Sequence, residues 1–428
     1  MVSRLLRNSS WQLLALAAPV VAEFVTAYQI TDALGLEAYG LLSFAYAFGL
    51  LFHLLLDLRL TEAAIQFLAP DLENHREQVG FRASQFVALE VSVRLLALML
   101  NGLAALGVVL FVSSPMVVPV TQVTAATLCL NYLVTGPCRG ILRICDGFAE
   151  QAIIAVLSAA FKVAAVTAVV QTLTPSPLQM AWTLLWATLP LPFLYLLGCS
   201  RVLARLGLGW ARPNFSFSPP VLRFVRFNYV ASLTMIPTRE LDVTLLAGCT
   251  DMSSLGAYKL AKSFVSAVWI LGDAFFLACY PELSRRVSRN QAGELRPWLS
   301  RQTLQLGGLG AILSLTCWVF LPPLLRRFFP SAGSEVAVYF RVMILSLPIW
   351  MAFLWLNPLI LALGKAEVFA YGSFLGGAAV TMLYLICIPL WQSWGAALVT
   401  ALSTPLVLLL IFALALRRST FEVACLRR

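Results

Sequence analysis

Long apolar runs recur along this whole chain, each of the length that crosses a lipid bilayer. The runs are about 20–30 residues long, enough to span the hydrocarbon core with some tilt. Only 12% of the 428 residues are charged and the mean hydropathy is +0.85, whereas a soluble domain carries about a quarter charged residues. The sequence therefore predicts an all-α integral membrane protein with no separate soluble domain.

Glycines, prolines and charged residues divide the apolar sequence into about twelve spans. A Pro-rich segment at 207–220 interrupts the series after the sixth span, which predicts a six-helix lobe at 1–206, a linker at 207–220 and a second lobe at 221–428. We place the spans at about 9–33, 39–69, 79–112, 119–144 and 151–173, a sixth ending near 206, then 221–247, 255–283, 298–321, 336–363, 366–390 and 394–416.

The distribution of arginine predicts the orientation in the membrane. An even number of spans puts both termini on one side, and with that side inside, the outer loops hold only Arg326 and Arg327. This asymmetry satisfies the positive-inside rule. It also explains most of the formal charge of +10 through contact with anionic lipid, without any nucleic acid. The apolar segment after Arg4 and Arg7 runs past Ala33, too long for a cleaved signal peptide, so we expect a retained first span.

The two predicted lobes also repeat each other weakly. Asn8 is followed some 30 residues later by LEAY at 36–39, and Asn228 is followed at a similar distance by LGAY at 255–258. Both matches have an offset of about 220 residues, with the linker at the midpoint. This pattern is typical of transporters whose halves are related by an axis along the membrane normal.

Charged residues inside the predicted spans are the main candidates for function. A charge at mid-bilayer costs about 2.5–3.5 kcal/mol on insertion scales, and such residues usually face a bundle interior or an aqueous cavity. Residues near helix ends can instead snorkel to the interface, and acid–base pairs can simply join helices; the number of charges favours a polar cavity. The candidates are Glu23, Asp57, Arg59, Glu62, Glu90, Arg94, Lys162, Arg239, Glu240, Asp242, Lys259, Lys262 and Asp273.

Spacing groups several of these charges. Lys259 and Lys262 are three residues apart and share a helical face, and Arg239 lies on the adjacent span, so the three predict one basic patch. The same spacing gives Arg239 and Asp242 one face, and Glu90 and Arg94 are one turn apart.

Motifs of soluble enzymes are absent from the sequence. The nine cysteines are scattered and the only histidines are His53 and His75, so neither a metal site nor a disulfide framework is indicated. There is no GxxxxGK[ST], GxSxG or HExxH sequence, so we expect no cofactor and no catalytic residues.

Several short segments resemble the bacterial polysaccharide (O-antigen and exopolysaccharide) flippases of the multidrug/oligosaccharidyl-lipid/polysaccharide (MOP) exporter superfamily. These are RNSSW at 7–11, LGLEAYG at 34–40, DLRLTEAA at 57–64 with FLA at 67–69, RELDVTLLAG at 239–248, and LGAY at 255–258. One departure is Arg59, which stands where that family usually has glycine.

The resemblance implies a V-shaped bundle of two lobes around a central cavity. It also implies transport of undecaprenyl-diphosphate-linked oligosaccharide from the cytoplasmic to the outer leaflet of a bacterial inner membrane, beside a polymerase or glycosyltransferases. A diphosphate needs cationic partners to cross hydrocarbon, and Glu23, Asp57 and Asp242 are candidates for coupling to a proton or sodium ion. The candidate diphosphate and cavity cations are Arg239, Lys259, Lys262, Arg59, Arg94 and Lys162.

Three alternatives remain at this point. A multidrug antiporter of the same superfamily would favour an acidic cavity for cationic cargo, whereas the intramembrane charges here are mixed. A lipid II flippase usually has two further spans. A membrane polymerase or ligase usually needs a large outer loop with catalytic residues, and the longest one here, about 322–335, contains no histidine.

Overall fold

The computed structural model describes residues 2–108, 112, 115–213, 215, 217–233, 236–269, 292–330, 332–362 and 366–417. Every regular element in these ranges is a helix, as the composition predicts. The chain divides into two compact units, Met1–Leu233 and Thr234–Arg428, and each is described by itself.

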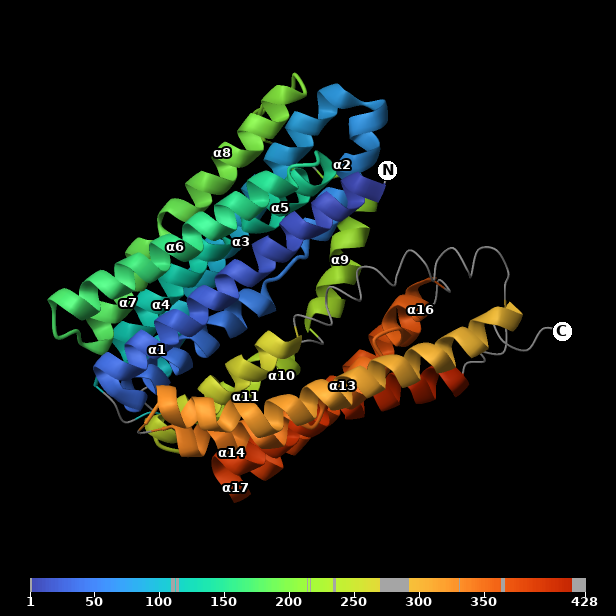
Figure 1. The fold of residues 1–428 in the computed structure, drawn as a ribbon. Coiled ribbons are helices and arrows are strands. Elements are labelled where there is room, and N and C mark those ends of the chain that lie inside the picture. Colours follow the sequence, from blue (N-terminus) through green and yellow to red (C-terminus); the bar gives the residue numbers. More distant parts are fainter. Residues whose placement is uncertain are drawn as a thin grey trace. The chain divides into compact units, whose positions relative to one another are not determined.

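The first unit is a bundle of helices that lie side by side, in blue to green in Figure 1. α1 packs against α4 and α6, and α2 packs against α3 and α5. The helices are α1 (Val2–Leu55), α2 (Leu60–Asn74), α3 (Arg76–Gly107), α4 (Val117–Tyr132), α5 (Thr135–Ile144), α6 (Phe148–Thr172), α7 (Pro177–Thr188), α8 (Pro190–Arg205) and α9 (Pro219–Leu233).

Two breaks divide the first 74 residues into three helical segments. Gly35 has φ 83° and ψ 172°, a conformation that glycine adopts without a Cβ clash, and it splits α1 into two helices that are each long enough to cross a bilayer. The second break lies between the end of α1 at Leu55 and the start of α2 at Leu60. It leaves a short stretch of non-helical backbone within the second predicted span.

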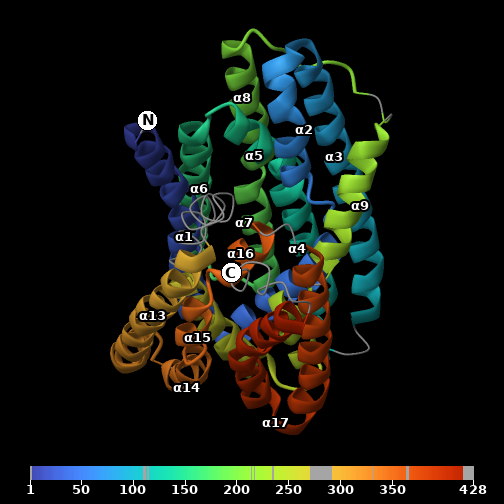
Figure 2. The same cartoon turned by 90° about the vertical axis from the view of Figure 1, so that its right-hand side faces the viewer.

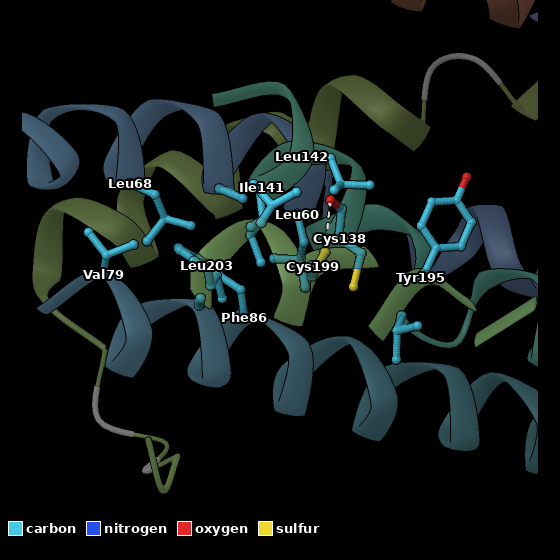
Figure 3. Close-up of a cluster of buried hydrophobic side chains, with 14 of the residues drawn as sticks. Leu60, Leu68, Val79, Phe86, Cys138, Ile141, Leu142, Tyr195, Cys199 and Leu203 are labelled. Atoms are coloured by element: carbon cyan, nitrogen blue, oxygen red, sulfur yellow. Dashed lines mark hydrogen bonds between the residues drawn. The ribbon is translucent and has the colours of Figure 1, made fainter. Parts of the chain in front are cut away.

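A buried apolar core fixes the helices around that second break. Leu60 and Leu68 of α2 pack with Val79 and Phe86 of α3, and Ile141 of α5 belongs to the same cluster (Figure 3). These side chains are almost fully buried. The core therefore holds α2 against α3 and α5, the helices that supply the polar groups of the first unit.

The Pro-rich linker and α9 belong to the first unit. The carbonyl oxygen of Gly209 lies so close to Gly80 of α3 that a Cβ at position 80 would meet it at 1.9 Å. The backbone N–H of Ala211 donates to Ser84 Oγ at 3.2 Å. α9 then runs beside α2 (Figure 2). Phe224 of α9 lies edge-on to Phe67 of α2 at 5.5 Å between ring centroids. The unit boundary thus falls after α9, whereas the predicted lobes divide at the linker that precedes it.

The second unit contains the remaining described helices. α13 packs against α14 and α15, and α14 packs against α17. A further helix covers residues 252–269, and the rest of the eighth predicted span, with Asp273, lies outside the described residues. The bounds are α10 (Ile236–Arg239), α11 (Leu241–Leu246), α13 (Ala292–Phe328), α14 (Gly333–Ile344), α15 (Leu347–Ala352), α16 (Leu356–Ala362) and α17 (Ala366–Arg417).

α17 contains two antiparallel spans joined at Gln392, whose φ of 49° breaks the helix. A Cβ on Gly372 would meet Ile411 Cγ1 at 2.6 Å, and one on Gly376 would meet Val407 Cγ2 at 2.7 Å. Because these glycines have no side chain, the two arms approach closely, as small residues allow in membrane helices. The two arms match the eleventh and twelfth predicted spans.

Eight stretches of helix in the described residues are long and apolar enough to cross a membrane. Two of them, Ser10–Leu55 and Glu367–Ala415, contain the breaks at Gly35 and Gln392, so each holds two predicted spans. The all-α, multi-pass membrane fold is therefore confirmed, while the count of twelve is compatible with the structure but not established by it. The seventh predicted span differs most, because it is divided among α9, α10 and α11.

Candidate functional site

The polar groups of the first unit gather at the helix break between α1 and α2. Arg59 is the N-cap residue of α2 and has φ 54° and ψ 42°, the left-handed region that favours glycine. Its backbone N–H donates to Asp57 Oδ1 at 3.0 Å. Glycine adopts this conformation without strain, and Arg59 adopts it at the position where the sequence resemblance leads us to expect glycine.

Arg94 of α3 is the centre of this cluster. Its guanidinium contacts Glu90 at 2.7 Å and Asp57 Oδ1 at 3.8 Å, and it donates to the carbonyl oxygen of His53 at 2.8 Å. The ring of Tyr132 lies 5.5 Å from the guanidinium carbon. The side chains of Glu90 and Arg94 are 3% and 5% exposed, so this is a buried ion pair.

Arg59 occupies the more accessible edge of the same cluster. It pairs with Glu62 at 2.9 Å and lies 3.9 Å from Asp57. Thr61, in the first turn of α2, donates to the carbonyl oxygen of Gly136 at 2.9 Å, which ties α2 to the start of α5. Asp57, Arg59, Glu62, Glu90 and Arg94 therefore form one group, which we call the unit-1 cluster.

Glu23 and Lys162 lie together elsewhere in the first unit. The Lys162 ammonium of α6 contacts Glu23 Oε2 of α1 at 2.6 Å. Six residues after Glu23, Gln29 donates to Thr167 Oγ1 at 2.7 Å. The sequence predicts an ion-coupling role for Glu23 and a cargo-binding role for Lys162. In the structure these two side chains form an ion pair with each other, which links α1 to α6.

A second ionic group lies in the second unit. The Lys262 ammonium lies 2.8 Å from both oxygens of Asp242, whose side chain is 1% exposed. The Tyr258 hydroxyl also donates to Asp242. That hydroxyl lies 2.7 Å from Thr400 Oγ1, which lies 3.0 Å from the hydroxyl of Tyr384. A buried network therefore joins α11 and the helix over 252–269 to both arms of α17.

Lys259 makes the matching contact one turn earlier. Its ammonium lies 2.8 and 2.7 Å from the two oxygens of Glu240, and both side chains are about 14% exposed or less. Glu240 sits between α10 and α11, where the helix is interrupted. Lys259 and Lys262 therefore lie close together, and each ammonium contacts its own carboxylate.

Arg239 is the exception within this group. The Lys262 ammonium donates to its carbonyl oxygen, yet the Arg239 guanidinium has no hydrogen-bond or ion-pair partner among the described residues, and the residue is exposed. Arg239 and Asp242, to which the spacing gives one helical face, do not pair; the partners of Asp242 are Lys262 and Tyr258. Arg239, Glu240, Asp242, Lys259 and Lys262 form the group that we call the unit-2 cluster.

Asp251 fixes the helix that supplies both lysines. It precedes residues 252–269, and its Oδ2 accepts the backbone N–H of Ser254 at 2.9 Å, as an N-cap residue does. This hydrogen bond from Ser254 lowers the pKa of the Asp251 carboxyl. The cap orients the first turns of the helix, from which Tyr258, Lys259 and Lys262 project.

Sequence reasoning missed the residues that connect these groups. Tyr258 belongs to the repeated LGAY segment, so the repeat was an available signal for it. No local sequence pattern predicts the contacts of Thr400 or Tyr384. The sequence analysis treats His53 as a potential metal ligand and in no other role. Among the described residues, no group of three or more metal-ligating side chains comes together, and the described cysteines are unpaired.

Solved structures with a similar fold are transporters and flippases of the MOP superfamily. A multidrug resistance MATE family transporter in its inward-facing conformation aligns with a TM-score of 0.75 at 11% identity, over 96% of this chain and 98% of its own. The lipid II flippase MurJ, in an inward closed conformation, aligns with a TM-score of 0.71 at 11% identity, over 97% and 89%. A MOP superfamily transporter from Pyrococcus furiosus, described as having a binding pocket of reverse polarity, aligns with a TM-score of 0.64 at 11% identity, over 98% and 96%. The chain thus has the fold of the MOP superfamily.

The family model described as "Polysaccharide biosynthesis protein" matches residues 5–287. Because this match covers well over half of the chain, the protein belongs to that family. None of the curated proteins matches it.

Proposed function

We propose that this protein carries a polyprenyl-diphosphate-linked oligosaccharide, with undecaprenyl as the lipid, from the cytoplasmic to the outer leaflet of a bacterial inner membrane. The observation that supports this proposal is the charge of the unit-2 cluster, in which three cations accompany two carboxylates. The exposed Arg239 guanidinium is the surplus cation. An anionic cargo would complete this cluster, whereas a cationic drug would be repelled by it.

The paired lysines suit a reversible anion site. Glu240 and Asp242 hold the two ammoniums one turn apart, so a diphosphate would meet preorganised donors instead of mobile side chains. A diphosphate that contacts Arg239 and then shares Lys259 and Lys262 with their carboxylates would be bound without being trapped. Charge-assisted hydrogen bonds of this kind are short and strong, and their competition with the carboxylates would favour release.

The remaining features of the proposal follow from the cargo. The sugars would occupy a hydrated cavity and the polyprenyl chain would stay in lipid, while the lobes rock between inward and outward access. A proton or sodium gradient would supply the energy. In this proposal both termini are cytoplasmic, and the glycosyltransferases and polymerase of polysaccharide synthesis act before and after transport.

The first test is translocation of a labelled polyprenyl-diphosphate oligosaccharide in proteoliposomes. The sharpest variant is Arg239→Ala, because it removes a cation without leaving a carboxylate unpaired. Beside it, the double variant Lys259→Met with Glu240→Gln removes one ion pair and keeps the cluster neutral at that position. The matched control is Lys162→Met with Glu23→Gln, which removes an ion pair from the first unit.

The proposal expects transport by the parent protein, its loss in Arg239→Ala and its retention in the Lys162/Glu23 control. Equal transport by the parent and Arg239→Ala would remove the anion site from the unit-2 cluster. Efflux of a cationic dye with no lipid translocation would favour the multidrug antiporter, and release of polymerised or ligated sugar would favour the enzyme.

A further inference from the structure

Arg341 is a cation inside the tenth predicted span, and it belongs to neither ionic cluster. It lies in the second half of α14, about 12 Å along the helix from Gly333 at a rise of 1.5 Å per residue. Its Nε is buried without a hydrogen-bond partner, and no carboxylate forms an ion pair with it among the described residues. A charged side chain at such a depth in a membrane helix needs a partner.

Acidic residues are scarce around Arg341. Between Glu294 and Glu367 the sequence contains a single acid, Glu335. The hydroxyl of Tyr339 donates to Glu335 Oε1 at 2.8 Å. Glu335 and Arg341 are not spaced three or four residues apart, so they project from different faces of α14. The second unit therefore offers Arg341 no acid of its own along α13 and α14.

α13 and α14 lie side by side in antiparallel order, in orange in Figure 1. Two contacts give their register. The guanidinium carbon of Arg341 lies 4.7 Å from the centre of the Trp318 ring. Nearer the start of α14, a Cβ on Gly333 would meet the Cα of Arg326 at 2.6 Å. We call this contact line the α13/α14 seam, and Trp318 is the aromatic partner of Arg341 within it.

The surface beside the seam is apolar and exposed. Leu315 and Phe320 of α13 are 64% and 66% exposed, and Leu345 of α14 is 60% exposed. The Trp318 side chain is itself 39% exposed. Both helices belong to stretches long and apolar enough to cross a membrane, so these side chains fit contact with lipid chains. Arg341 thus stands at the edge of an apolar, exposed surface.

Two further arginines lie toward the end of the seam to which Arg341 points. Side chains of a helix lean toward its N-terminus, which for α14 is the end beside Arg326. Arg326 and Arg327 occupy the last turn of α13, and both are exposed without an ion-pair partner among the described residues. In the predicted orientation they are also the only arginines of the outer loops. Cations on that side run against the positive-inside rule, which favours a local role for them.

We propose that the α13/α14 seam binds an anionic phospholipid, whose phosphate contacts Arg341 and whose headgroup lies near Arg326 and Arg327. A guanidinium offers a planar fork of donors that suits phosphate, and Trp318 holds it by stacking. Arg341 can extend along the seam toward the headgroup, as long basic side chains do at membrane interfaces. The site is separate from both ionic clusters and independent of the cargo and of the direction of transport.

The apolar surface favours a phospholipid over free phosphate. One leaflet contributes about 15 Å of hydrocarbon, which equals about ten residues of helix. Over that length from Trp318, α13 exposes Leu315, Ile312 and Leu309, on which acyl chains can lie. A phospholipid is also far more abundant in the surrounding bilayer than a biosynthetic intermediate, so mass action favours it. The three arginines select a headgroup without an ammonium.

The test is lipid retention by the full-length protein in detergent, titrated with phosphatidylglycerol or phosphatidylcholine and measured by native mass spectrometry. We expect the parent to retain one more phosphatidylglycerol than Arg341→Met, with binding about ten- to a hundredfold tighter, as for hydrogen bonds to a charged group. The matched control is Arg205→Met, which removes the same charge from an ion pair with Glu150 in the first unit. It should retain lipid like the parent.

Thermal unfolding separates a lipid site from a structural role. Phosphatidylglycerol should raise the Tm of the parent and of Arg205→Met, and should leave that of Arg341→Met unchanged. Without this lipid, Arg341→Met should be as stable as the parent, because the removed charge has no carboxylate. Should Arg341→Met fail to fold, Trp318→Leu carries the test, since loss of the stacked ring should also weaken phosphatidylglycerol binding.

Three results would overturn the proposal. The first is equal retention of phosphatidylglycerol by the parent and by Arg341→Met, or by Trp318→Leu in its place. The second is equal retention of phosphatidylcholine and phosphatidylglycerol by the parent, which would mean that charge is not recognised. The third is displacement of phosphatidylglycerol by an equal concentration of undecaprenyl diphosphate or of inorganic phosphate, which would assign the seam to the cargo or to a free anion.

Discussion

The two ionic clusters are built from different cations and balance their charges differently. The unit-1 cluster uses arginine, and one guanidinium serves two acids. The unit-2 cluster uses lysine, one ammonium for each acid, with the Arg239 guanidinium left over. A planar guanidinium has several donors and can bridge, whereas an ammonium is a compact point charge. In the first arrangement one guanidinium contacts two acids, and in the second each acid has its own ammonium.

This difference suggests a division of labour between the units. Transport of an anionic lipid against its gradient needs one site for the cargo and one for the driving ion, and the two must not neutralise each other. In the proposed function, the unit-2 cluster with its extra cation Arg239 would serve the cargo. The predictions below test whether the contrast between shared and matched charges is real.

The largest effect is expected from Arg94→Met, which tests charge sharing. At a pH at which Glu90 is ionised, the variant leaves Glu90 without its guanidinium and Asp57 with Arg59 alone, at 3.9 Å. Removal of one partner from a buried ion pair costs about 3–5 kcal/mol. Thermal unfolding in detergent would measure the loss. Adding Glu90→Gln should restore most of it, and a double variant as unstable as the single one would contradict the shared-charge description.

Lys262→Met should cost about 3 kcal/mol, at the lower end for a buried pair, because Tyr258 still donates to Asp242. Adding Asp242→Asn to the same chain should restore almost all of the lost free energy of unfolding, because Asp242 and Lys262 form a pair of one acid and one lysine. A double-mutant cycle on the free energy of unfolding measures this coupling. Additive costs would show that the two side chains do not depend on each other.

Asp251→Ala should have a smaller effect, about 1 kcal/mol, typical for an N-cap residue. The pKa of Asp251 is lowered in the folded protein, so its contribution is present above the ordinary aspartate pKa of about 4 and is lost as the pH falls through the lowered value. The free energies of unfolding of the parent and the variant should therefore become equal at acid pH. Equal differences at neutral and acid pH would argue against a charged cap.

The smallest effect is expected from Lys162→Met. Its partner Glu23 is 56% exposed, and interhelical polar contacts of this kind average about 0.6 kcal/mol in membrane proteins. Unfolding in detergent should change little, and transport should persist. A loss as large as that of Arg94→Met would place the Glu23 pair among the essential clusters.

The sequence predicts the fold well because its signals are local. Runs of bilayer length, Gly35 and the prolines locate the helices, and the spacing of Lys259 and Lys262 correctly gives them a common helical face. The partners of these charges depend on helix rotation and distant contacts. Thr400, for instance, is 142 residues from Tyr258, and periodicity contains no information on their contact.

Some local inferences also failed for a physical reason. Arg239 and Asp242 share a face in an ideal helix, but the turn at Glu240 interrupts that helix, so Lys262 takes Asp242 instead. In the first unit, Arg59 has a left-handed backbone conformation. The one sequence signal for it is that Arg59 stands where the resemblance leads us to expect glycine. Charged residues at helix breaks are thus the least predictable part of this chain.

The linker packs closely on α3, and this limits where the chain tolerates an insertion. The Gly209 carbonyl oxygen lies against Gly80, the Trp210 indole N–H donates to Ser200 Oγ, and the Ala211 N–H donates to Ser84 Oγ. The linker is therefore not a free connection into which a reporter or protease site could be inserted. An insertion in the linker would break these contacts and separate the linker from α3.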